Sequence, residues 1–316
     1  MGLVYKYYCF GHGRDKGEVR GRMIRQVITY CGKGYKPRYK EVDIFSYTEP
    51  VGSKGKRARK RKKSSLIQKR LNDTNSKRYF IQLVETNFTE GDQRVDLTYA
   101  IMPESEEEAD RMVVNFLKKI KRRRNKLHLT QLKYVWVNEH GKNGRIHHHL
   151  IINGGLSREE IEDMWSYTKR KGKPQERIGY VNCEPLQFSA KDGIKGLVNY
   201  ITKETFKKED EPCGQMTFSD LSDGAELSLS DLLVDDAKGK KRWKQSKNLI
   251  KPHKSTKDNA LSRRQVMKLV SMPSDCEYVR NFFSQRFPDY YIDTIAYRFN
   301  EVLASWSIYL TMHRRN

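Results

Sequence analysis

The sequence predicts an α+β fold, in which helices pack on an antiparallel sheet. From residue 78 onward, segments with strand and helix patterns follow in the order strand, helix, hairpin, helix, strand, helix. Two of the strands are joined by a short turn that contains Asn-Gly, which makes them antiparallel neighbours. The strict alternation of strand and helix that builds a doubly wound parallel sheet is missing.

The first strand and the first helix have the clearest patterns. Segment 94–100 (RVDLTYA) alternates apolar and polar residues, as a half-buried strand does. Ser105 is a suitable N-cap for a helix that follows, and the three glutamates after it form an acidic first turn. Apolar residues then recur at helical spacing as far as Ile120, and the basic segment KRRRNK suits the C-terminal end of the helix dipole.

The remaining elements follow in order. The runs QLKYVWVNE and RIHHHLII read as the two strands of a hairpin, with HGKNG as the turn. SREEIEDMWSY predicts a short capped helix, and IGYVNCEPL predicts a fourth strand. Residues 190–207 predict another helix, although Gly193 and Gly196 weaken its start.

Composition divides the chain into four parts. Residues 1–77 read as a basic N-terminal extension, in which segment 54–63 carries eight basic residues in ten and is either a phosphate-binding arm or a solvated linker. Residues 78–208 hold the patterned elements and form the expected main folded domain. Residues 209–237 are an acidic linker or insertion, and residues 238–316 form a basic and aromatic region that is expected to be small and helical.

Charge and apolar content limit the functional classes. The 62 Lys and Arg residues outnumber the 39 Asp and Glu residues, and a formal charge of +23 favours a polyanionic partner, foremost nucleic acid. A basic soluble protein without such a partner is the alternative. No apolar run is long enough for a secretion signal or a membrane span, so we expect a cytoplasmic protein. Five cysteines without a CxxC pair suit reduced thiols better than disulfides or a zinc site.

The hairpin carries a candidate metal site. His147 and His149 lie two apart in a predicted strand, so their side chains point to one face of the sheet, and His148 points to the other. Imidazole is the commonest protein ligand for metals, and a strand presents two of them rigidly. We therefore predict that His147 and His149 bind a divalent metal.

A third ligand comes from the register of the hairpin. A five-residue loop at 140–144 would pair residue 137 with His147, which places Glu139 diagonal to His147 and on the same face. Glu139 would then complete a site for Mg²⁺ or Mn²⁺, although imidazole also accepts Zn²⁺. A salt bridge to Arg145 is the alternative role for Glu139. The opposite face is expected to pack under helices, with His148 among these apolar residues: Tyr134, Trp136, Ile146, Leu150 and Ile152.

The last predicted helix carries a candidate nucleophile. Tyr200 and Lys203 lie three residues apart, so they project from one face of this helix. A tyrosine on a helix is more commonly a packing residue, and a Tyr-x-x-Lys pair arises easily by chance. The pair gains meaning from its position, downstream of a histidine-rich strand in a basic protein.

The order of these motifs resembles that of HUH endonucleases: the strand DLTY, then RIHHHLII with His-x-His, then NYITKE with Tyr-x-x-Lys. More specifically, residues 78–205 resemble the initiators of rolling-circle replication in bacterial phages, plasmids and integrated elements. A weaker resemblance covers residues 242–252. In this family the middle residue of the histidine motif is usually apolar or aromatic, and here it is His148.

The resemblance implies a function and a set of roles. Tyr200 would attack a phosphate of single-stranded DNA, assisted by Lys203, beside a metal held by His147, His149 and Glu139. The product would be a 5′-phosphotyrosyl enzyme, with a 3′-hydroxyl that a polymerase can extend. Basic residues near the site, Lys142 and Arg145, are candidate DNA contacts.

The sequence is also compatible with other functions. The same chemistry serves single-tyrosine relaxases and transposases. A non-catalytic DNA-binding regulator would use Tyr200 only for packing, and a metal-dependent hydrolase would use water in place of tyrosine. The DNA must be unpaired at the site, and the chain lacks the GxxxxGK[ST] motif of an ATP-driven motor, so we expect a host helicase as a partner.

Overall fold

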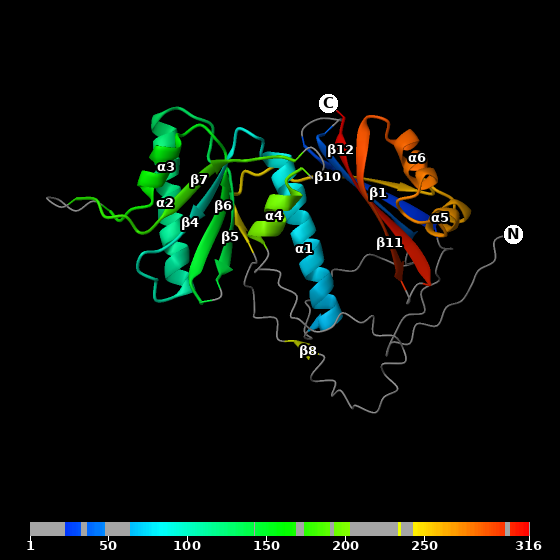
Figure 1. The fold of residues 1–316 in the computed structure, drawn as a ribbon, viewed down its shortest axis with the longest axis horizontal. Coiled ribbons are helices and arrows are strands. Elements are labelled where there is room, and N and C mark those ends of the chain that lie inside the picture. Colours follow the sequence, from blue (N-terminus) through cyan, green and yellow to red (C-terminus); the bar gives the residue numbers. More distant parts are fainter. Residues whose placement is uncertain are drawn as a thin grey trace, which may run out of the picture. The chain divides into compact units, whose positions relative to one another are not determined.

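The chain folds into two units, each with its own sheet (Figure 1). The structure is a computed structural model that describes residues 23–32, 37–47, 64–141, 143–168, 174–189, 193–202, 233–234, 243–300 and 304–315. Residues 61–250 form the central unit, and residues 1–60 together with 251–316 form the terminal unit. The expected basic arm at 54–63 and nearly all of the acidic segment lie outside the described residues.

The central unit contains a five-stranded antiparallel sheet in the order β7-β4-β6-β5-β9. Its strands are β4 (Gln93–Leu97), β5 (Tyr134–His140), β6 (Ile146–Ile152), β7 (Val181–Pro185) and β9 (Lys244–Gln245). The expected first strand, hairpin and fourth strand are therefore confirmed. A separate two-residue ladder joins β3 (Ser64–Ser65) to β8 (Leu233–Val234).

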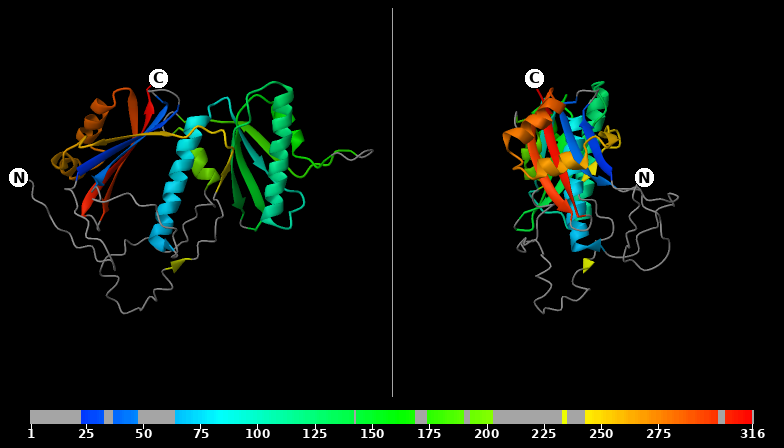
Figure 2. Two further views of the ribbon diagram at one scale, coloured as in Figure 1. Left: turned by 180° about the vertical axis from the view of Figure 1, so that it is seen from behind. Right: turned by 90° about the vertical axis from the view of Figure 1, so that its right-hand side faces the viewer.

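Helices cover both faces of this sheet (Figures 1 and 2). Helices α2 (Glu106–Lys126) and α3 (Arg158–Met164) pack on one face through a core that includes Trp136, Leu150 and Phe116. Helices α1 (Leu66–Asn87) and α4 (Lys195–Ile201) pack on the other face, around Val135, Val137 and Ile151. Because side chains alternate along a strand, the two cores are separated by the sheet itself.

Local signals place the helices of the first face. The hydroxyl of Ser105 accepts a hydrogen bond from the Glu108 amide at 3.1 Å, and glutamates fill the first turn of α2. In α3, Ser157 and Glu160 form a capping box, in which each side chain binds the backbone of the other residue. Both helices are confirmed close to the predicted bounds.

Helix α1 lacks a signal in the sequence. Its buried positions include apolar Phe80, Leu83 and Val84, but also the polar Gln82 and Glu85. These polar residues interrupt the apolar stripe that would predict a helix. Two hydrogen bonds between the Asn87 amide group and the backbone of Ile250, at 2.7 and 2.8 Å, hold its C-terminal end.

The terminal unit contains the second five-stranded antiparallel sheet, in the order β10-β1-β2-β12-β11. Its strands are β1 (Met23–Cys31), β2 (Tyr39–Tyr47), β10 (His253–Asp258), β11 (Tyr290–Asn300) and β12 (Ser305–Arg314). Helices α5 (Arg263–Val270) and α6 (Glu277–Arg286) cover one face and bury Val266, Leu269 and Phe283.

The terminal unit differs from the expected N-terminal extension and small helical C-terminal region. Strands from both ends of the chain join in one sheet, as the pairings Ile28–Ser255 and Val42–Leu310 show. The units therefore divide the chain near residues 60 and 250, and α1 runs across the expected boundary after residue 77. None of the described helices has an apolar stretch of the length needed to cross a membrane.

Candidate active site

The hairpin aligns the predicted metal ligands on one face. Strand β5 ends at His140 and β6 begins at Ile146, so the loop covers residues 141–145, and Gly144 takes a φ of 72° in it. Glu139 pairs directly with His147, and Val137 pairs with His149. The predicted register is wrong by two residues, because the loop begins one residue later than expected. A shift of two keeps every side chain on its face, so Glu139 still lies beside both histidines.

His149 is held between two carboxylates. Its Nδ1 lies 2.6 Å from Oδ1 of Asp96, which pairs with it across β4 and β6, and its Nε2 is hydrogen-bonded to Oε2 of Glu139. A carboxylate only accepts hydrogen bonds, so this arrangement places a proton on both ring nitrogens. Burial lowers the pKa of His149, but the hydrogen bonds to Asp96 and Glu139 outweigh it and raise the pKa above its ordinary value.

Arg94 extends this chain of charges along β4. Its guanidinium binds the Asp96 carboxylate, with Nη2 at 2.6 Å from Oδ2 and Nε at 3.1 Å from Oδ1. Burial raises the pKa of the Asp96 carboxyl, but hydrogen bonds from His149 and Arg94 hold it below its ordinary value. Asp96 is therefore an anion that fixes the imidazole of His149 from the side opposite Glu139.

Tyr200 lies at the same site and is open to solvent. Its ring centroid is 6.0 Å from that of His149 in an edge-on arrangement, and the Arg94 guanidinium lies 5.0 Å from the tyrosine ring. The neighbours Val198 and Ile201 are buried in the core and anchor the helix, whereas Tyr200 is 59% exposed. Tyr200 is thus presented by α4 rather than packed under it.

Helix α1 fixes the start of the helix that carries Tyr200. Glu85, only 3% exposed, accepts a hydrogen bond at 3.0 Å from the amide of Ile194, the N-cap residue of α4. A carboxylate at this end of a helix binds a free amide and complements the helix dipole. The buried contacts of Ile194, Val198 and Ile201 with α1 belong to the same core.

Of the other predicted site residues, His147 and Arg145 lie on the hairpin, and the rest lie outside the described residues. His147 is partly exposed on the same face, opposite Glu139. Arg145 is exposed, and its Nη2 donates a hydrogen bond to the Tyr99 carbonyl at 2.8 Å, which ties the hairpin loop to the end of β4. Lys142 and Lys203 lie outside the described residues. A DNA-binding role for Arg145 stays a prediction.

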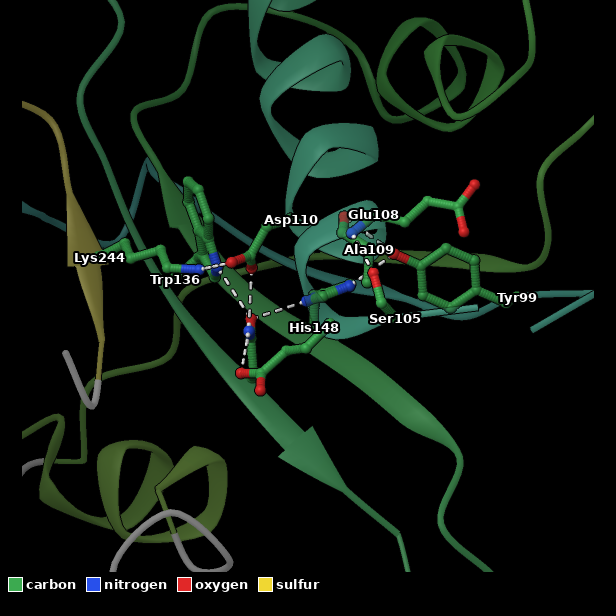
Figure 3. Close-up of polar contacts among 10 residues, drawn as sticks. Tyr99, Ser105, Glu108, Ala109, Asp110, Trp136, His148 and Lys244 are labelled. Carbon is green, nitrogen blue, oxygen red and sulfur yellow. Dashed lines mark hydrogen bonds and ion pairs between the residues drawn. The ribbon is translucent and has the colours of Figure 1, made fainter. Parts of the chain in front are cut away.

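His148 belongs to the opposite face, as expected, and is completely buried. Its Nε2 lies 2.6 Å from the hydroxyl of Tyr99, and its Nδ1 lies 2.9 Å from Oδ1 of Asn138 (Figure 3). Burial lowers the pKa of His148 to about 3, so the ring is neutral near pH 7. A neutral ring carries one proton, and its neighbours decide which nitrogen holds it.

The amide of Asn138 settles this choice. Its Nδ2 faces two carboxylates, at 3.0 Å from Asp110 and 3.3 Å from Glu106, so its Oδ1 faces Trp136 Nε1 and His148. The His148 proton therefore lies on Nδ1, and Nε2 accepts a hydrogen bond from Tyr99. This network joins β6 to β5, to α2 and to the chain just after β4, and it holds the middle of the histidine strand in place.

The donors around His149 suit a divalent cation. Within the described part of the chain, no three His, Cys, Asp or Glu side chains are arranged around a ready-made metal site. Both nitrogens of His149 are engaged by carboxylates. Two imidazoles and a carboxylate on one sheet face are nevertheless ligand types that Mn²⁺, Mg²⁺ and Zn²⁺ accept.

Fold and site together define an α+β protein with histidines, carboxylates and an exposed tyrosine gathered on one face of an antiparallel sheet. Residues 93–208 match the family described as "Replication-associated protein ORF2/G2P". The matched region is a little over a third of the chain and includes Asp96, Glu139, both site histidines and Tyr200. Searches of curated proteins and of solved structures gave no significant match. The family match supports a role in DNA replication.

Proposed function

We propose that this protein initiates rolling-circle replication by nicking single-stranded DNA and rejoining it through a 5′-phosphotyrosyl intermediate. The observation that carries the proposal is the position of Tyr200, exposed and within 6.0 Å, ring to ring, of a histidine that lies between two carboxylates. The family match at residues 93–208 and the net charge of +23 support a DNA substrate.

His147, His149 and Glu139 would hold Mg²⁺ or Mn²⁺ at this face. The Nε2–H of His149 donates a hydrogen bond to the carboxylate of Glu139, so Nε2 would have to lose this proton before it could bind a cation. The Nδ1 of His149 would keep its proton and donate a hydrogen bond to Asp96, which orients the ring for metal binding. When bound, the cation would supply charge stabilisation at the scissile phosphate.

Tyr200 would be the nucleophile. Its Oη would form a bond to phosphorus as the bond from phosphorus to the 3′ oxygen breaks, and the phenol would lose a proton while the leaving oxygen gains one. A phenol has an ordinary pKa of about 10, so it is protonated near pH 7. A nearby cation favours the phenolate and helps the phenol to lose its proton. Arg94 is the described cation nearest the ring, and Lys203 remains a proposed assistant.

Three other functions can be compared with this proposal. A regulator that uses Tyr200 only for packing is disfavoured, because the side chain is 59% exposed. A relaxase or transposase would use the same residues, and the choice among these depends on the DNA. For an initiator, an origin hairpin, a host helicase and a polymerase are the proposed partners.

The test compares two tyrosines of the central unit. We expect the wild-type protein, given labelled single-stranded DNA and Mn²⁺, to form a covalent adduct that survives denaturing electrophoresis. The Tyr200→Phe variant should form none. The Tyr180→Phe variant is the matched control, because Tyr180 is also exposed, at 67%, and lies just before β7.

The outcomes separate the candidate mechanisms. An adduct that requires Mn²⁺ and Tyr200 but not Tyr180 supports the proposal. Cleavage without an adduct in the wild-type protein would contradict the tyrosine mechanism and favour metal-activated water. An adduct in the Tyr200→Phe variant would show that another residue is the nucleophile.

A further inference from the structure

The terminal unit holds more than its share of positive charge. It contains 26 Lys and Arg residues against 11 Asp and Glu residues, a formal charge of +15 over 126 residues. The central unit, with 36 against 28, carries +8 over 190 residues. The unit that carries the candidate active site is therefore the less basic of the two, and the larger excess of positive charge lies on the unit without that site, where it favours a second contact with nucleic acid.

Among the residues of the terminal unit that the structure describes, the excess of positive charge is concentrated in the segment that forms β10 and α5. Segment 251–268 contains six Lys and Arg residues and a single carboxylate, Asp258. That carboxylate is neutralised by Arg25 of the neighbouring strand, with two contacts at 2.6 and 2.8 Å. The basic side chains of this segment thus have no acidic residue of their own segment left to oppose them.

The basic side chains of this part of the unit are exposed on the side of the sheet that the helices cover. Helix α5 buries Val266 and Leu269 against the sheet and exposes its basic residues to solvent. In α6, Arg286 reaches the carbonyl of Ala260, between β10 and α5, at 3.0 Å. Lys257 is exposed and pairs with Gln26, on the face that the helices cover. We define the basic surface by Lys257, Arg263, Arg264, Lys268 and Arg286.

The basic residues at the start of α5 do not stabilise this helix. Arg263 and Arg264 lie in its first turn, which contains no acidic residue, and positive charge there opposes the helix dipole. By contrast, α6 begins with Glu277, and the three glutamates of the first turn of α2 follow the favourable pattern. Local departures from the most stable choice are expected where residues serve a function.

The chemistry of the surface selects the partner. Sites for unpaired bases combine cations with open aromatic rings for stacking. Within α5 and α6, the exposed aromatic ring is that of Tyr278, and Lys268 Nζ lies 4.6 Å from its centre. The exposed rings of Tyr291 and Phe299 on β11 are engaged as well, since the Arg315 guanidinium lies 4.7 Å from the centre of Tyr291, and the Phe299 ring lies 5.1 Å from that of Trp306. What remains is a set of cations suited to phosphates.

We propose that the basic surface binds the sugar-phosphate backbone of duplex DNA, without reading its sequence. This site goes beyond the nicking reaction, because it requires neither Tyr200 nor a metal. It would hold the protein on double-stranded DNA while the central unit acts on an unpaired segment. Since Arg264 and Lys268 lie one helical turn apart and both are exposed, neutralising the two removes adjacent phosphate contacts.

The test uses the full chain in the presence of a chelator, so that no cleavage occurs. Binding to a labelled duplex of about 30 base pairs is measured over a series of salt concentrations. For the Arg264→Gln/Lys268→Gln variant we expect about tenfold weaker binding and a salt slope reduced by about 2, equally for unrelated sequences. The Lys118→Gln/Arg122→Gln variant is the matched control, since it removes an exposed pair with the same spacing from α2.

Circular dichroism checks that both variants are folded, and loss of the charges in the first turn of α5 should not weaken that helix. Equal loss of binding in both variants would overturn the proposal, because it would reflect total charge alone. An unchanged salt slope in the α5 variant would also overturn it. The same holds if this variant bound duplex DNA normally and lost only its binding to single-stranded DNA or to vesicles of anionic lipid. Adduct formation by the α5 variant on single-stranded DNA should remain, which separates this test from that of Tyr200.

Discussion

At the scale of single residues, the site depends on how His149 is held. One carboxylate on each side of the ring fixes both nitrogens, and the two carboxylates differ in their surroundings. Asp96 is also bound by Arg94, whereas Glu139 is free of that ion pair and faces His147 across the hairpin. We therefore propose that Asp96 orients the imidazole ring of His149 and that Glu139 is a metal ligand.

Asp96 gives the first prediction at this scale. The Asp96→Ala variant loses the acceptor that orients Nδ1 of His149, so we expect the Mn²⁺ concentration for half-maximal adduct formation to rise about 10–100-fold. Asp96→Asn keeps an acceptor oxygen and should lie between this variant and the wild type. Glu184→Ala is the control. It removes a carboxylate from the same sheet face, at the position opposite Arg94 in the pairing of β4 with β7, and leaves Asp96 in place. An unchanged metal requirement in Asp96→Ala would refute the role of Asp96.

His148 gives a prediction on stability. Its pKa is about 3 in the folded protein and about 6.5 when unfolded, so the unfolded chain binds more protons between these values. The free energy of unfolding should therefore fall as the pH is lowered from 6.5 toward 3. His148→Gln can keep both hydrogen bonds without titrating, so it should cost about 1 kcal/mol at pH 7 and flatten this dependence. Urea unfolding at several pH values measures both, and an equally steep dependence in the variant would contradict the assignment.

At the scale of elements, the position of Tyr200 depends on a helix that lies far away in the sequence. Helix α4 has only seven residues and lacks a side-chain cap at its own N-cap, Ile194. Short helices gain little from their own hydrogen bonds and take their stability from packing. Helix α1 supplies that packing and, through Glu85, the missing cap.

Glu85 can be tested through the amide that it binds. In Glu85→Ala the Ile194 amide loses its acceptor, so we expect faster hydrogen exchange at α4, a stability loss of about 1–3 kcal/mol and a lower rate of adduct formation. Glu85→Gln retains an acceptor oxygen and should recover most of the rate. If Glu85→Ala left both the exchange and the rate unchanged, α1 would not position Tyr200.

The elements that could be predicted are those with local signals. Helix α2 has a capping serine, an acidic first turn and a periodic apolar face, and the hairpin has an Asn-Gly turn between alternating strands. Helix α1 could not be predicted, because the polar Gln82 and Glu85 are buried on the face it turns to the core. The hairpin register was wrong by two residues, since pattern fixes the face of a strand but not its offset.

At the scale of the whole molecule, the sheet of the terminal unit could not be predicted from the sequence. Its β1 and β2 pair with β10 and β12, and these pairings join residues that are more than 200 positions apart. Strands β1 and β2 resemble short apolar stretches in a basic segment, whereas β10 (HKSTKD) has no apolar residue at all. No local rule reveals which strands pair. Charge composition did indicate a nucleic-acid partner, but it could not show that a separate unit holds most of the excess.

The candidate site was predictable to the extent that its residues lie on one element. The spacing of His147 and His149 defines a shared face, and Glu139 follows from the hairpin that joins its strand to theirs. Arg94 and Asp96 lie on β4, and their contacts with His149 and Tyr200 depend on strand order and helix packing. Those contacts become visible only in the folded chain.

The most direct test of the central claim is to locate the nucleotide on the protein. The adduct formed with single-stranded DNA and Mn²⁺ is digested with nuclease and trypsin, and the modified peptide is sequenced by mass spectrometry. Cleavage after lysine should release residues 196–203 (GLVNYITK), and we expect the nucleotide on Tyr200 in this peptide. A nucleotide on any other tyrosine, or on none, would contradict the assignment of Tyr200 as the nucleophile.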